Sequence, residues 1–298
     1  MSNNDIFPIL ITGSSGQLAT LIFKELIERG APPSQIIAVT RTPEKLAQLA
    51  SRGVVVRYGD FDKPETLPKA FEGAKRAMII SSSPEAYLEG KRLTQQRAAV
   101  AAAINSDVEH IYYTSAPHPE ESKPGDAHYD HYQTELAIQA SGKKWTILRH
   151  FEWPDWHLEN NWLPALAKGY YYTGAGSGRI AHMTREDAAA ADAGALLAPA
   201  SEVVNRRFDL TGPEGLTADD IMKTMSEVSG KPIKVIHVSP EELGERLVAE
   251  GTDPVTANIF VIVAKLIRKG GYDGVTDHAE KFSGRRRTNM REFLAGKL

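Results

Sequence analysis

The sequence predicts an α/β fold, in which a doubly wound parallel sheet is followed by a smaller and mainly helical C-terminal portion. One observation is that short apolar runs alternate with helix-like periodicity through residues 1–150, a pattern typical of a parallel sheet covered on both faces. A second is a glycine-punctuated turn directly after the first apolar run. A third is a change of composition after residue 150, where three of the four tryptophans fall within residues 151–172.

Six strands and five helices are expected in the first half. The apolar runs predict strands over 7–12, 36–40, 54–58, 77–80, 110–114 and 145–148. Segments with helical periodicity separate them, at about 17–28, 43–51, 64–72, 85–106 and 131–141. Right-handed crossovers between such strands produce a doubly wound sheet. We therefore expect residues 1–150 to form one domain.

The second half is expected to form a smaller, mainly helical region over residues 151–298, with strands that return to the main sheet. Its pattern predicts an alanine-rich helix over about 185–197, strands over 207–211 and 232–238, and helices over 240–250 and 254–269. A further helix is expected over 217–229. Thr217 and Asp220 mark its start, because this spacing of a threonine and an acidic residue is similar to a capping box.

Composition excludes several classes of partner and site. The chain has 298 residues with 42% hydrophobic content, and its formal net charge of −3 includes no long single-sign run. We therefore expect neither a nucleic acid nor a membrane surface as partner. The absence of cysteine excludes disulfides, thiolate metal sites and a cysteine nucleophile. The sequence shows no signal-peptide pattern and no apolar stretch of about 18 residues, so a cytoplasmic location is expected.

The turn after the first strand is the most informative motif. It reads Gly13-Ser14-Ser15-Gly16-Gln17-Leu18-Ala19, a G-x-x-G-x-x-A variant of the dinucleotide-binding fingerprint. Glycines permit a tight turn and the close approach of a pyrophosphate, and the N-terminus of the following helix favours an anion. The motif predicts a Rossmann-like domain over residues 1–150. The residues expected to bind the dinucleotide here are Gly13, Ser15, Gly16, Gln17 and Leu18.

The end of the second expected strand indicates which nicotinamide cofactor is bound. An acidic residue there would bind the ribose 2′-hydroxyl of NAD. This chain has instead Thr40-Arg41-Thr42-Pro43, with no carboxylate to repel a 2′-phosphate and with a guanidinium that can grip one. NADP(H) is therefore expected rather than NAD(H). The alternative is that Arg41 is only a solvated loop residue.

Further cofactor contacts are expected at the ends of later strands. Asp60 and Phe61 follow the third strand, where the adenine edge usually lies, and would act as hydrogen-bond acceptor and apolar wall. The other candidates, at the ends of the fourth, fifth and sixth strands, are Ser81, Ser82, Thr114 and Phe151. For the serines the alternative is an ordinary polar loop.

Together these motifs resemble those of the atypical short-chain dehydrogenase/reductases, and within that group the NmrA-like branch. The resemblance extends over nearly the whole chain and points to the type formed by NADPH-dependent quinone oxidoreductases and triphenylmethane reductases. Besides the first turn, it rests on Val39-Thr40-Arg41, Tyr58-Gly59-Asp60-Phe61, Tyr112-Tyr113-Thr114-Ser115, His131-Tyr132-Gln133-Thr134-Glu135 and Thr184-Arg185-Glu186-Asp187.

The sequence departs from the usual chemistry of that superfamily. Its members commonly use a Tyr-x-x-x-Lys pair to protonate a carbonyl, but here His131 and Glu135 take those positions. The departure favours hydride delivery to an electron-poor conjugated acceptor, with the proton taken from water. His131 is the expected catalytic residue, or else it positions the cofactor. Ser115 is the second candidate, or else a strand-end hydroxyl bonded to the backbone.

Aromatic residues near the expected cleft are predicted to bind a planar acceptor. They are Trp153, Trp156 and Tyr132. The alternative for the aromatic segment 151–172 is a core or the contact of a homodimer. His128 and His131 are spaced i,i+3, but no third ligand is evident, so no metal is expected.

The sequence therefore predicts an NADPH-dependent oxidoreductase that delivers hydride to a quinone-like or other conjugated aromatic acceptor. An alternative of a different class is a non-catalytic NADP(H)-sensing regulatory protein of the NmrA type, which the missing Tyr-x-x-x-Lys pair would suit. A third is a reductase of a specialised biosynthetic intermediate, which the aromatic segment would permit.

Overall fold

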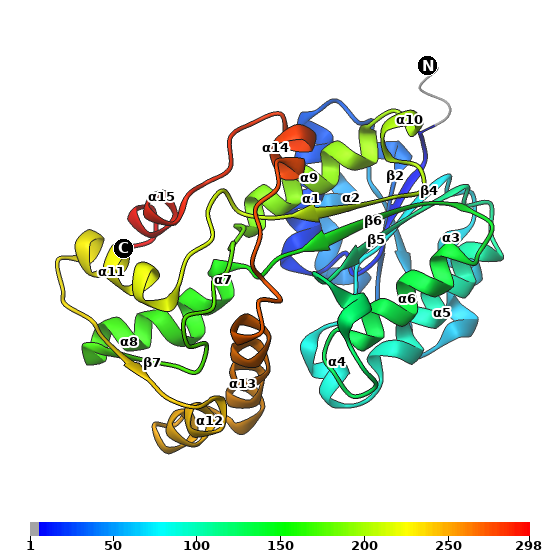
Figure 1. Ribbon diagram of the computed structural model, residues 1–298. Coiled ribbons are helices and arrows are strands. Elements are labelled where there is room, and N and C mark those ends of the chain that lie inside the picture. Colours follow the sequence, from blue (N-terminus) through cyan, green and yellow to red (C-terminus); the bar gives the residue numbers. More distant parts are fainter. Residues whose placement is uncertain (1–5) are drawn as a thin grey trace. The chain divides into compact units, whose positions relative to one another are not determined.

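The computed structural model describes residues 6–298, and the chain divides into two compact units (Figure 1). Unit 1 comprises the chain up to His150 together with Ala188–Asp209 and Glu280–Gly284. Unit 2 comprises Phe151–Asp187, Leu210–Ala279 and Arg285–Leu298. The second half of the chain therefore contributes two segments to the unit that the first half builds.

A seven-stranded sheet forms the centre of unit 1, in the order β3-β2-β1-β4-β5-β6-β8. The strands are β1 (Ile9–Ile11), β2 (Ile36–Thr40), β3 (Val55–Tyr58), β4 (Arg76–Ile79), β5 (His110–Ser115), β6 (Lys144–His150) and β8 (Arg206–Leu210). The neighbours from β3 to β6 pair in parallel. The strand order reverses between β1 and β4, and ligands of open α/β sheets bind at the carboxyl edge beside such a switch point. The predicted Rossmann-like doubly wound fold is confirmed.

Helices cover both faces of this sheet. They are α1 (Gln17–Glu28), α2 (Ala47–Ser51), α3 (Leu67–Phe71), α4 (Pro84–Leu88), α5 (Arg92–Ile104), α6 (Tyr129–Gln139), α9 (Arg185–Leu197), α10 (Ala200–Val203) and α14 (His278–Ser283). Short 3-10 turns lie at Pro33–Gln35, Pro43–Leu46, Pro64–Thr66 and Pro119–Glu121. Helices α3, α5 and α6 lie on one face of the sheet, and α1 and α9 lie on the other (Figure 1).

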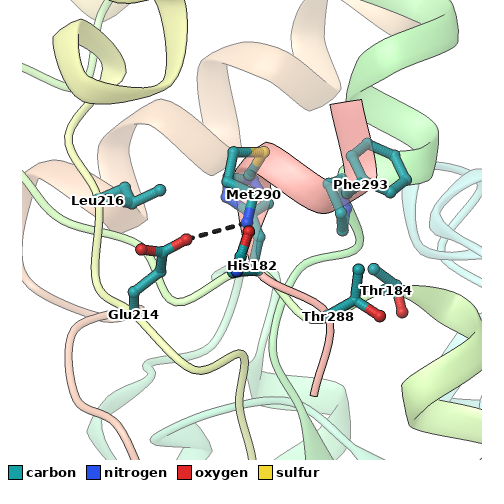
Figure 2. Close-up of a pocket in the computed structure, with 9 residues that line it drawn as sticks. His182, Thr184, Glu214, Leu216, Thr288, Met290 and Phe293 are labelled. Carbon is teal, nitrogen blue, oxygen red and sulfur yellow. Dashed lines mark hydrogen bonds between the residues drawn. The ribbon is translucent and has the colours of Figure 1, made fainter. Parts of the chain in front are cut away.

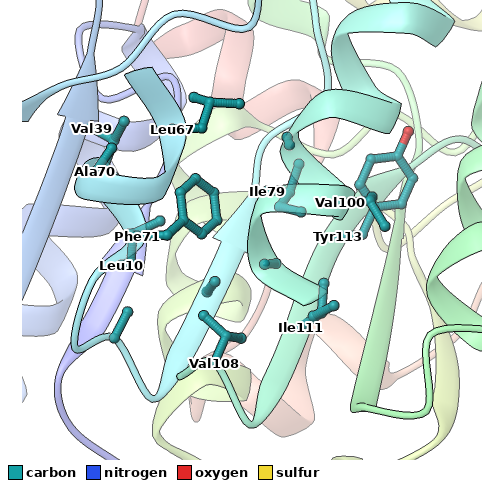
Figure 3. Packing of buried hydrophobic residues seen from close by; sticks show 14 of the residues in the cluster. Leu10, Val39, Leu67, Ala70, Phe71, Ile79, Val100, Val108, Ile111 and Tyr113 are labelled. Carbon is teal, nitrogen blue, oxygen red and sulfur yellow. The ribbon is translucent and has the colours of Figure 1, made fainter. Parts of the chain in front are cut away.

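The core beneath α3 and α5 holds the central strands in place (Figure 3). Leu10, Ile79 and Ile111 project from β1, β4 and β5 and are fully buried. They pack in one cluster with Phe71 of α3 and Val100 of α5. Full burial of such a side chain stabilises the folded state by about 1.5–3 kcal/mol relative to leaving it exposed. This packing fixes the strands whose carboxyl ends form the edge of the sheet beside the switch point between β1 and β4.

Three helices of unit 1 differ from the sequence prediction because of glycine and proline. The helix expected over 85–106 is two helices, α4 and α5, because Gly90 between them has a φ of +69°, which interrupts the helix. The helices expected after β2 and β3 each begin as a 3-10 turn, at Pro43 and Pro64. Only the short helices α2 and α3 follow these turns.

Unit 2 is mainly helical. Its helices are α7 (Pro154–His157), α8 (Leu163–Lys168), α11 (Ala218–Ser229), α12 (Pro240–Ala249), α13 (Pro254–Arg268) and α15 (Met290–Ala295), with a π-helical turn at Leu158–Trp162. The predicted capping box at Thr217 and Asp220 is confirmed. Within residues 6–298, none of the helices combines the length and the apolar character needed to cross a membrane.

A separate two-stranded parallel sheet lies in unit 2. It pairs β7 (Tyr170–Thr173) with β9 (Lys234–His237). The strand expected over 232–238 therefore exists but does not join the main sheet. The strand expected over 207–211 does join it, as β8 beside β6.

Candidate functional site

The turn between β1 and α1 has a backbone that favours glycine. Gly13 has a φ of +61°, in the left-handed region. Gly16 donates its N–H to the carbonyl oxygen of Gly13 at 2.9 Å, and a Cβ on Gly16 would lie 3.1 Å from that oxygen. The N–H of Ser14 donates to the carbonyl oxygen of Val39 at 3.1 Å. The turn is therefore tight and is tied to β2.

The N-terminus of α1 is open to an anion. No side chain caps this helix, and its first turn contains no acidic residue. The unpaired N–H groups of such a helix end bind phosphates. The residues Gly13, Ser15, Gly16 and Gln17 are exposed. The side chain of Leu18 is only 5% exposed, so Leu18 offers its backbone alone.

Two threonine hydroxyls join the loops at the carboxyl edge of the sheet. Thr12 Oγ1 accepts the N–H of Ile80 at 3.0 Å, and Thr114 Oγ1 accepts the N–H of Ser81 at 2.9 Å. These bonds fix the segment after β4 to the carboxyl ends of β1 and β5. Thr114 is 4% exposed, whereas Ser81 and Ser82 are half-buried and keep some free surface.

Arg41 is exposed at the end of β2, where the sequence predicts a phosphate-binding group. Its guanidinium forms no hydrogen bond or ion pair with any residue of the described range 6–298. The preceding Thr40 donates its hydroxyl to Ser15 Oγ at 3.1 Å, which links the end of β2 to the turn before α1. A free guanidinium at this position suits a 2′-phosphate.

Asp60 and Phe61 follow β3 as expected. Asp60 Oδ1 accepts the N–H of Asp62 at 3.0 Å, so this carboxylate shapes its own turn. Phe61 is half-buried against the core of unit 1. The strand end requires Gly59, because a Cβ there would lie 2.6 Å from Val39 Cγ1.

Ser115 belongs to a buried ion-pair cluster. Its hydroxyl donates to Glu135 Oε1 at 2.7 Å. Glu135 is 1% exposed and also accepts Arg149 Nε at 3.0 Å and Nη2 at 2.9 Å. These donors compensate the carboxylate for its loss of water, and they join α6 to β5 and β6. The proton of Ser115 is thus engaged, and a hydrogen bond from it to a substrate would require this bond to break.

His131 lies on α6 with one ring nitrogen engaged. Its Nδ1 is 2.8 Å from the hydroxyl oxygen of Tyr113, and the residue is 8% exposed. Burial, and then the positive charge of Arg92, lower the pKa of His131 well below its usual value, so the imidazole is neutral at pH 7. Its Nε2 forms no hydrogen bond with another residue between 6 and 298. Tyr132, the next residue, is half-buried.

The neighbouring His128 is held by the backbone. Its Nδ1 lies 2.9 Å from the carbonyl oxygen of Pro117, as expected for a hydrogen bond. In the part of the chain that the structure describes, no group of three or more histidine, aspartate or glutamate side chains is arranged to hold a metal ion.

The aromatic residues expected at the acceptor differ in how far they are packed. Phe151 is 2% exposed and belongs to the core of unit 2. Trp156 is half-buried, with its ring centroid 4.6 Å from that of Phe260. Trp153 is also half-buried, and the Arg185 guanidinium lies 5.0 Å from its ring centroid. The core alternative for the segment 151–172 therefore describes Phe151 and Trp162, which is also 2% exposed in that core, while Trp153 and Trp156 keep part of their surface.

A small hollow in unit 2 contains a buried histidine (Figure 2). His182 lines it together with apolar residues such as Leu216 and Phe293. Neither ring nitrogen of His182 has a hydrogen-bond partner among the described residues, and burial lowers the pKa of this imidazole well below its usual value. Glu214 also lines the hollow, and its Oε1 accepts the N–H of Met290 at 2.9 Å.

The residues that fix the side chains of His131 and Glu135 in place were not predicted from the sequence. Tyr113 contacts His131, and Arg149 contacts Glu135. A signal for Tyr113 was available, because alternation along a strand places it on the same face as Ser115. No local signal points to Gln96, which lies on another helix and accepts the Tyr113 hydroxyl.

Comparison with known proteins shows what the chain is similar to. The sequence profile of a family described as NAD(P)H-binding matches residues 13–197. Quinone oxidoreductase 2 of Escherichia coli K12 is 31% identical over 96% of this chain and 97% of its own length. An NAD(P)H azoreductase of Xenophilus azovorans is 24% identical over 96% of each chain. The crystal structure of Citrobacter sp. triphenylmethane reductase complexed with NADP(H) has a TM-score of 0.89 at 33% identity, and covers 97% of this chain and 100% of the other.

Proposed function

Because the chain belongs to the NAD(P)H-binding family, in the NmrA-like branch of the short-chain dehydrogenase/reductases, we propose that it is an NADPH-dependent reductase of quinone-like or other conjugated aromatic acceptors. The observation that carries the proposal is the open turn at the N-terminus of α1, with exposed Gly13 and Gly16 and no capping side chain. Relatives named for quinones, azo compounds and triphenylmethanes support an aromatic acceptor.

Residues of unit 1 would hold the cofactor. The backbone N–H groups at the start of α1 would bind the pyrophosphate, and Arg41 would bind the 2′-phosphate. The loops that Thr12 and Thr114 tie together would give the cofactor a rigid floor. When bound, NADPH supplies the hydride.

The side chains near His131 support hydride delivery without a tyrosine acid. Tyr129 is followed four residues later by Gln133, and Tyr132 by Leu136, so neither tyrosine begins a Tyr-x-x-x-Lys pair. His131 is neutral and has a free Nε2 with which it would contact acceptor or cofactor. The proton that completes the reduction would then come from water.

The test is NADPH oxidation followed at 340 nm with menadione, malachite green and an azo dye as acceptors. We expect acceptor-dependent oxidation with at least one of them. Gly13→Ala is expected to raise the KM for NADPH, because an alanine at a φ of +61° strains the phosphate-binding turn. The matched control is Gly73→Ala, which introduces the same kind of strain at a φ of +70° and is expected to leave that KM unchanged.

A second candidate function is NADP(H) sensing without catalysis. Two observations favour it: Glu135 accepts the Ser115 hydroxyl proton, and neither Tyr129 nor Tyr132 of α6 begins a Tyr-x-x-x-Lys pair. The same experiment decides between the two. Calorimetric binding of NADPH, without oxidation in the presence of any of the three acceptors, would favour the sensor. Acceptor-dependent turnover would exclude it.

We propose Trp153 as the main acceptor contact, with Trp156 and Tyr132 as further ones. Aromatic stacking contributes about 0.5–1.5 kcal/mol beyond the buried area, and 1.4 kcal/mol corresponds to tenfold in affinity. Trp153→Ala is therefore expected to raise the KM for menadione by about tenfold while the KM for NADPH stays unchanged. Trp153→Phe keeps an aromatic face and is expected to recover most of the loss. A stacking role would be contradicted if Trp153→Ala and Trp153→Phe had the same effect as each other on the KM for menadione and on the KM for NADPH.

A further inference from the structure

The side chains of Gln96, Tyr113 and His131 form a buried chain of hydrogen bonds in unit 1. Gln96 and Tyr113 are fully buried, and His131 is 8% exposed. The hydroxyl oxygen of Tyr113 lies 2.5 Å from Gln96 Oε1 and 2.8 Å from His131 Nδ1. Helices α5 and α6 and strand β5 thus meet at one hydroxyl group.

The chemistry of these atoms determines where the hydrogens lie. In the amide orientation of the structure, Gln96 Oε1 faces the Tyr113 hydroxyl, and Gln96 Nε2 has no hydrogen-bond partner among the described residues. An amide carbonyl oxygen can only accept, so in this orientation Tyr113 donates its single proton to Gln96 Oε1. A lone pair of the Tyr113 oxygen then faces His131 Nδ1, and Nδ1 must carry a hydrogen. A neutral imidazole has only one N–H, so Nε2 is left as a hydrogen-bond acceptor.

The surroundings keep this imidazole neutral. Arg92 is 5% exposed and forms an ion pair with Asp130, with Nε and Oδ2 separated by 3.3 Å. A second positive charge on His131 would be unfavourable beside this buried guanidinium. His128 and His150 also lie close enough to oppose such a charge.

We propose that Tyr113 and Gln96 are positioning residues that hold His131 as the Nδ1–H tautomer, so that Nε2 accepts a hydrogen bond from a hydroxyl-bearing ligand. The proposal rests on the reductase function proposed above. Two hydroxyls suit it, namely a ribose hydroxyl of the cofactor and the hydroxyl of a reduced, hydroquinone-like acceptor.

In this arrangement His131 does not protonate the acceptor. Conversion of a quinone to a hydroquinone adds one hydride, supplied by NADPH, and one proton. Because Nε2 carries no hydrogen, the proton is taken from water. We therefore expect kcat to change less than twofold between pH 6 and pH 8.

The tautomer can be observed directly by NMR of the full chain labelled with ¹⁵N-histidine. His131→Gln identifies the signals of this residue. In the wild-type protein we expect a protonated Nδ1 and an unprotonated Nε2. Tyr113→Phe removes the partner of Nδ1, so the Nε2–H tautomer that free histidine favours is expected to appear. Tyr112→Phe is the matched control, because its hydroxyl is buried too but has no hydrogen-bond partner among the described residues.

Two results would overturn the positioning role. One is a protonated Nε2 in the wild-type protein, and the other is an unchanged tautomer in Tyr113→Phe. If Tyr113→Phe does not fold, Gln96→Met replaces it. Methionine keeps the approximate size of glutamine, but its thioether sulfur is only a weak hydrogen-bond acceptor. Tyr113 is then expected to donate its proton to His131 Nδ1 instead, so the same change of tautomer is expected.

The ligand is identified in the same spectra. A shift of the Nε2 signal on addition of NADP⁺ alone would assign the ribose hydroxyl. A shift only when resorcinol is added to the NADP⁺-loaded protein would assign the acceptor hydroxyl, and no shift with either would overturn ligand binding at Nε2. Tyr113→Phe is expected to raise the KM of the assigned ligand about fivefold. The tautomer is measured without turnover, so the two proposals can fail separately. If the protein shows the expected tautomer but oxidises no NADPH, the proposed reductase function is rejected and the positioning role of Tyr113 and Gln96 is kept.

Discussion

Arg41 is the side chain through which the cofactor preference can be tested. Its guanidinium is exposed and unpaired within residues 6–298. A hydrogen bond to a charged group contributes about 1.5–3 kcal/mol, which corresponds to roughly ten- to hundredfold in affinity. We expect Arg41→Ala to raise the KM for NADPH by about tenfold or more and to leave the KM for NADH unchanged in steady-state assays.

An exposed arginine outside the proposed site provides the control. Arg52 follows α2, and Arg52→Ala is expected to leave both KM values unchanged. Equal losses with NADPH and NADH in Arg41→Ala would show that Arg41 supports the loop rather than the 2′-phosphate.

His182 determines part of the pH dependence of stability. Burial lowers the pKa of His182 in the folded state, whereas an unfolded histidine has a pKa of about 6.5. Above pH 6.5 the imidazole is neutral in both states and adds no pH dependence. As the pH falls below 6.5, the unfolded state binds a proton that the folded state does not. The free energy of unfolding therefore decreases by up to about 1.4 kcal/mol per pH unit.

His182→Leu is expected to reduce this slope between pH 6.5 and pH 5. Urea unfolding can be followed through the fluorescence of Trp162, whose ring centroid lies 5.4 Å from that of His182. His237→Leu removes a half-exposed histidine of the same unit, whose Nε2 lies 3.0 Å from Asp219 Oδ2. Because ion pairs between exposed side chains contribute little to stability, this variant is expected to change the slope little. A slope that stays the same in His182→Leu would show that His182 is accessible to protons in the folded state.

Single residues of the candidate site could be predicted from the sequence where the signal is local. Gly13 is detected through glycine spacing, and Arg41 through its place after a strand. The partners of a residue could not be predicted in this way. Whether the Ser115 hydroxyl is free depends on Glu135. Ser115 lies on β5 and Glu135 on α6, and the two side chains meet only in the folded chain.

Among the elements, α9 and α14 approach each other closely at a glycine. A Cβ on Gly194 would lie 1.9 Å from the carbonyl oxygen of Phe282. Alanine favours a helix over glycine by about 1 kcal/mol, but overpacking costs about 1–3 kcal/mol. We expect Gly194→Ala to destabilise unit 1, as a lower Tm in thermal unfolding.

Gly244→Ala in α12 is the matched control within a helix. Its Cβ would lie 2.9 Å from Val261 Cγ2, a side-chain methyl group of α13 rather than a backbone carbonyl. We expect a smaller loss of Tm than in Gly194→Ala. A rise of Tm in both variants would mean that α9 and α14 can separate at little cost.

The strands of unit 1 could be predicted well because each apolar run of the sequence corresponds to one strand of the sheet. Helix boundaries were less accurate, since Gly90 interrupts one expected helix and Pro43 begins another as a 3-10 turn. Strand β7 was missed, because its tyrosines indicate an aromatic cluster as readily as a strand. Its pairing with β9 depends on segments far apart in the chain.

For the whole molecule, the sheet of unit 1 is not complete within residues 1–150. Strand β8 lies beside β6, and the fully buried alanines of α9, including Ala188 and Ala191, belong to the same unit. We expect a fragment of residues 1–150 to lack a cooperative thermal transition in circular dichroism, because it loses strand β8 and a helix of the core. The full chain is expected to show one. A cooperative fragment that also binds NADPH would contradict this expectation.

The path of the chain between the units has a consequence for biosynthesis. The polypeptide passes from one unit to the other five times, after residues 150, 187, 209, 279 and 284. A ribosome adds about 5–20 residues per second, so the nascent sheet waits on the order of ten seconds for its last pieces. During that interval its unfinished apolar surface is available to chaperones. Residues 1–150 are made before the segments that complete their sheet, and they are therefore among the last to be finished.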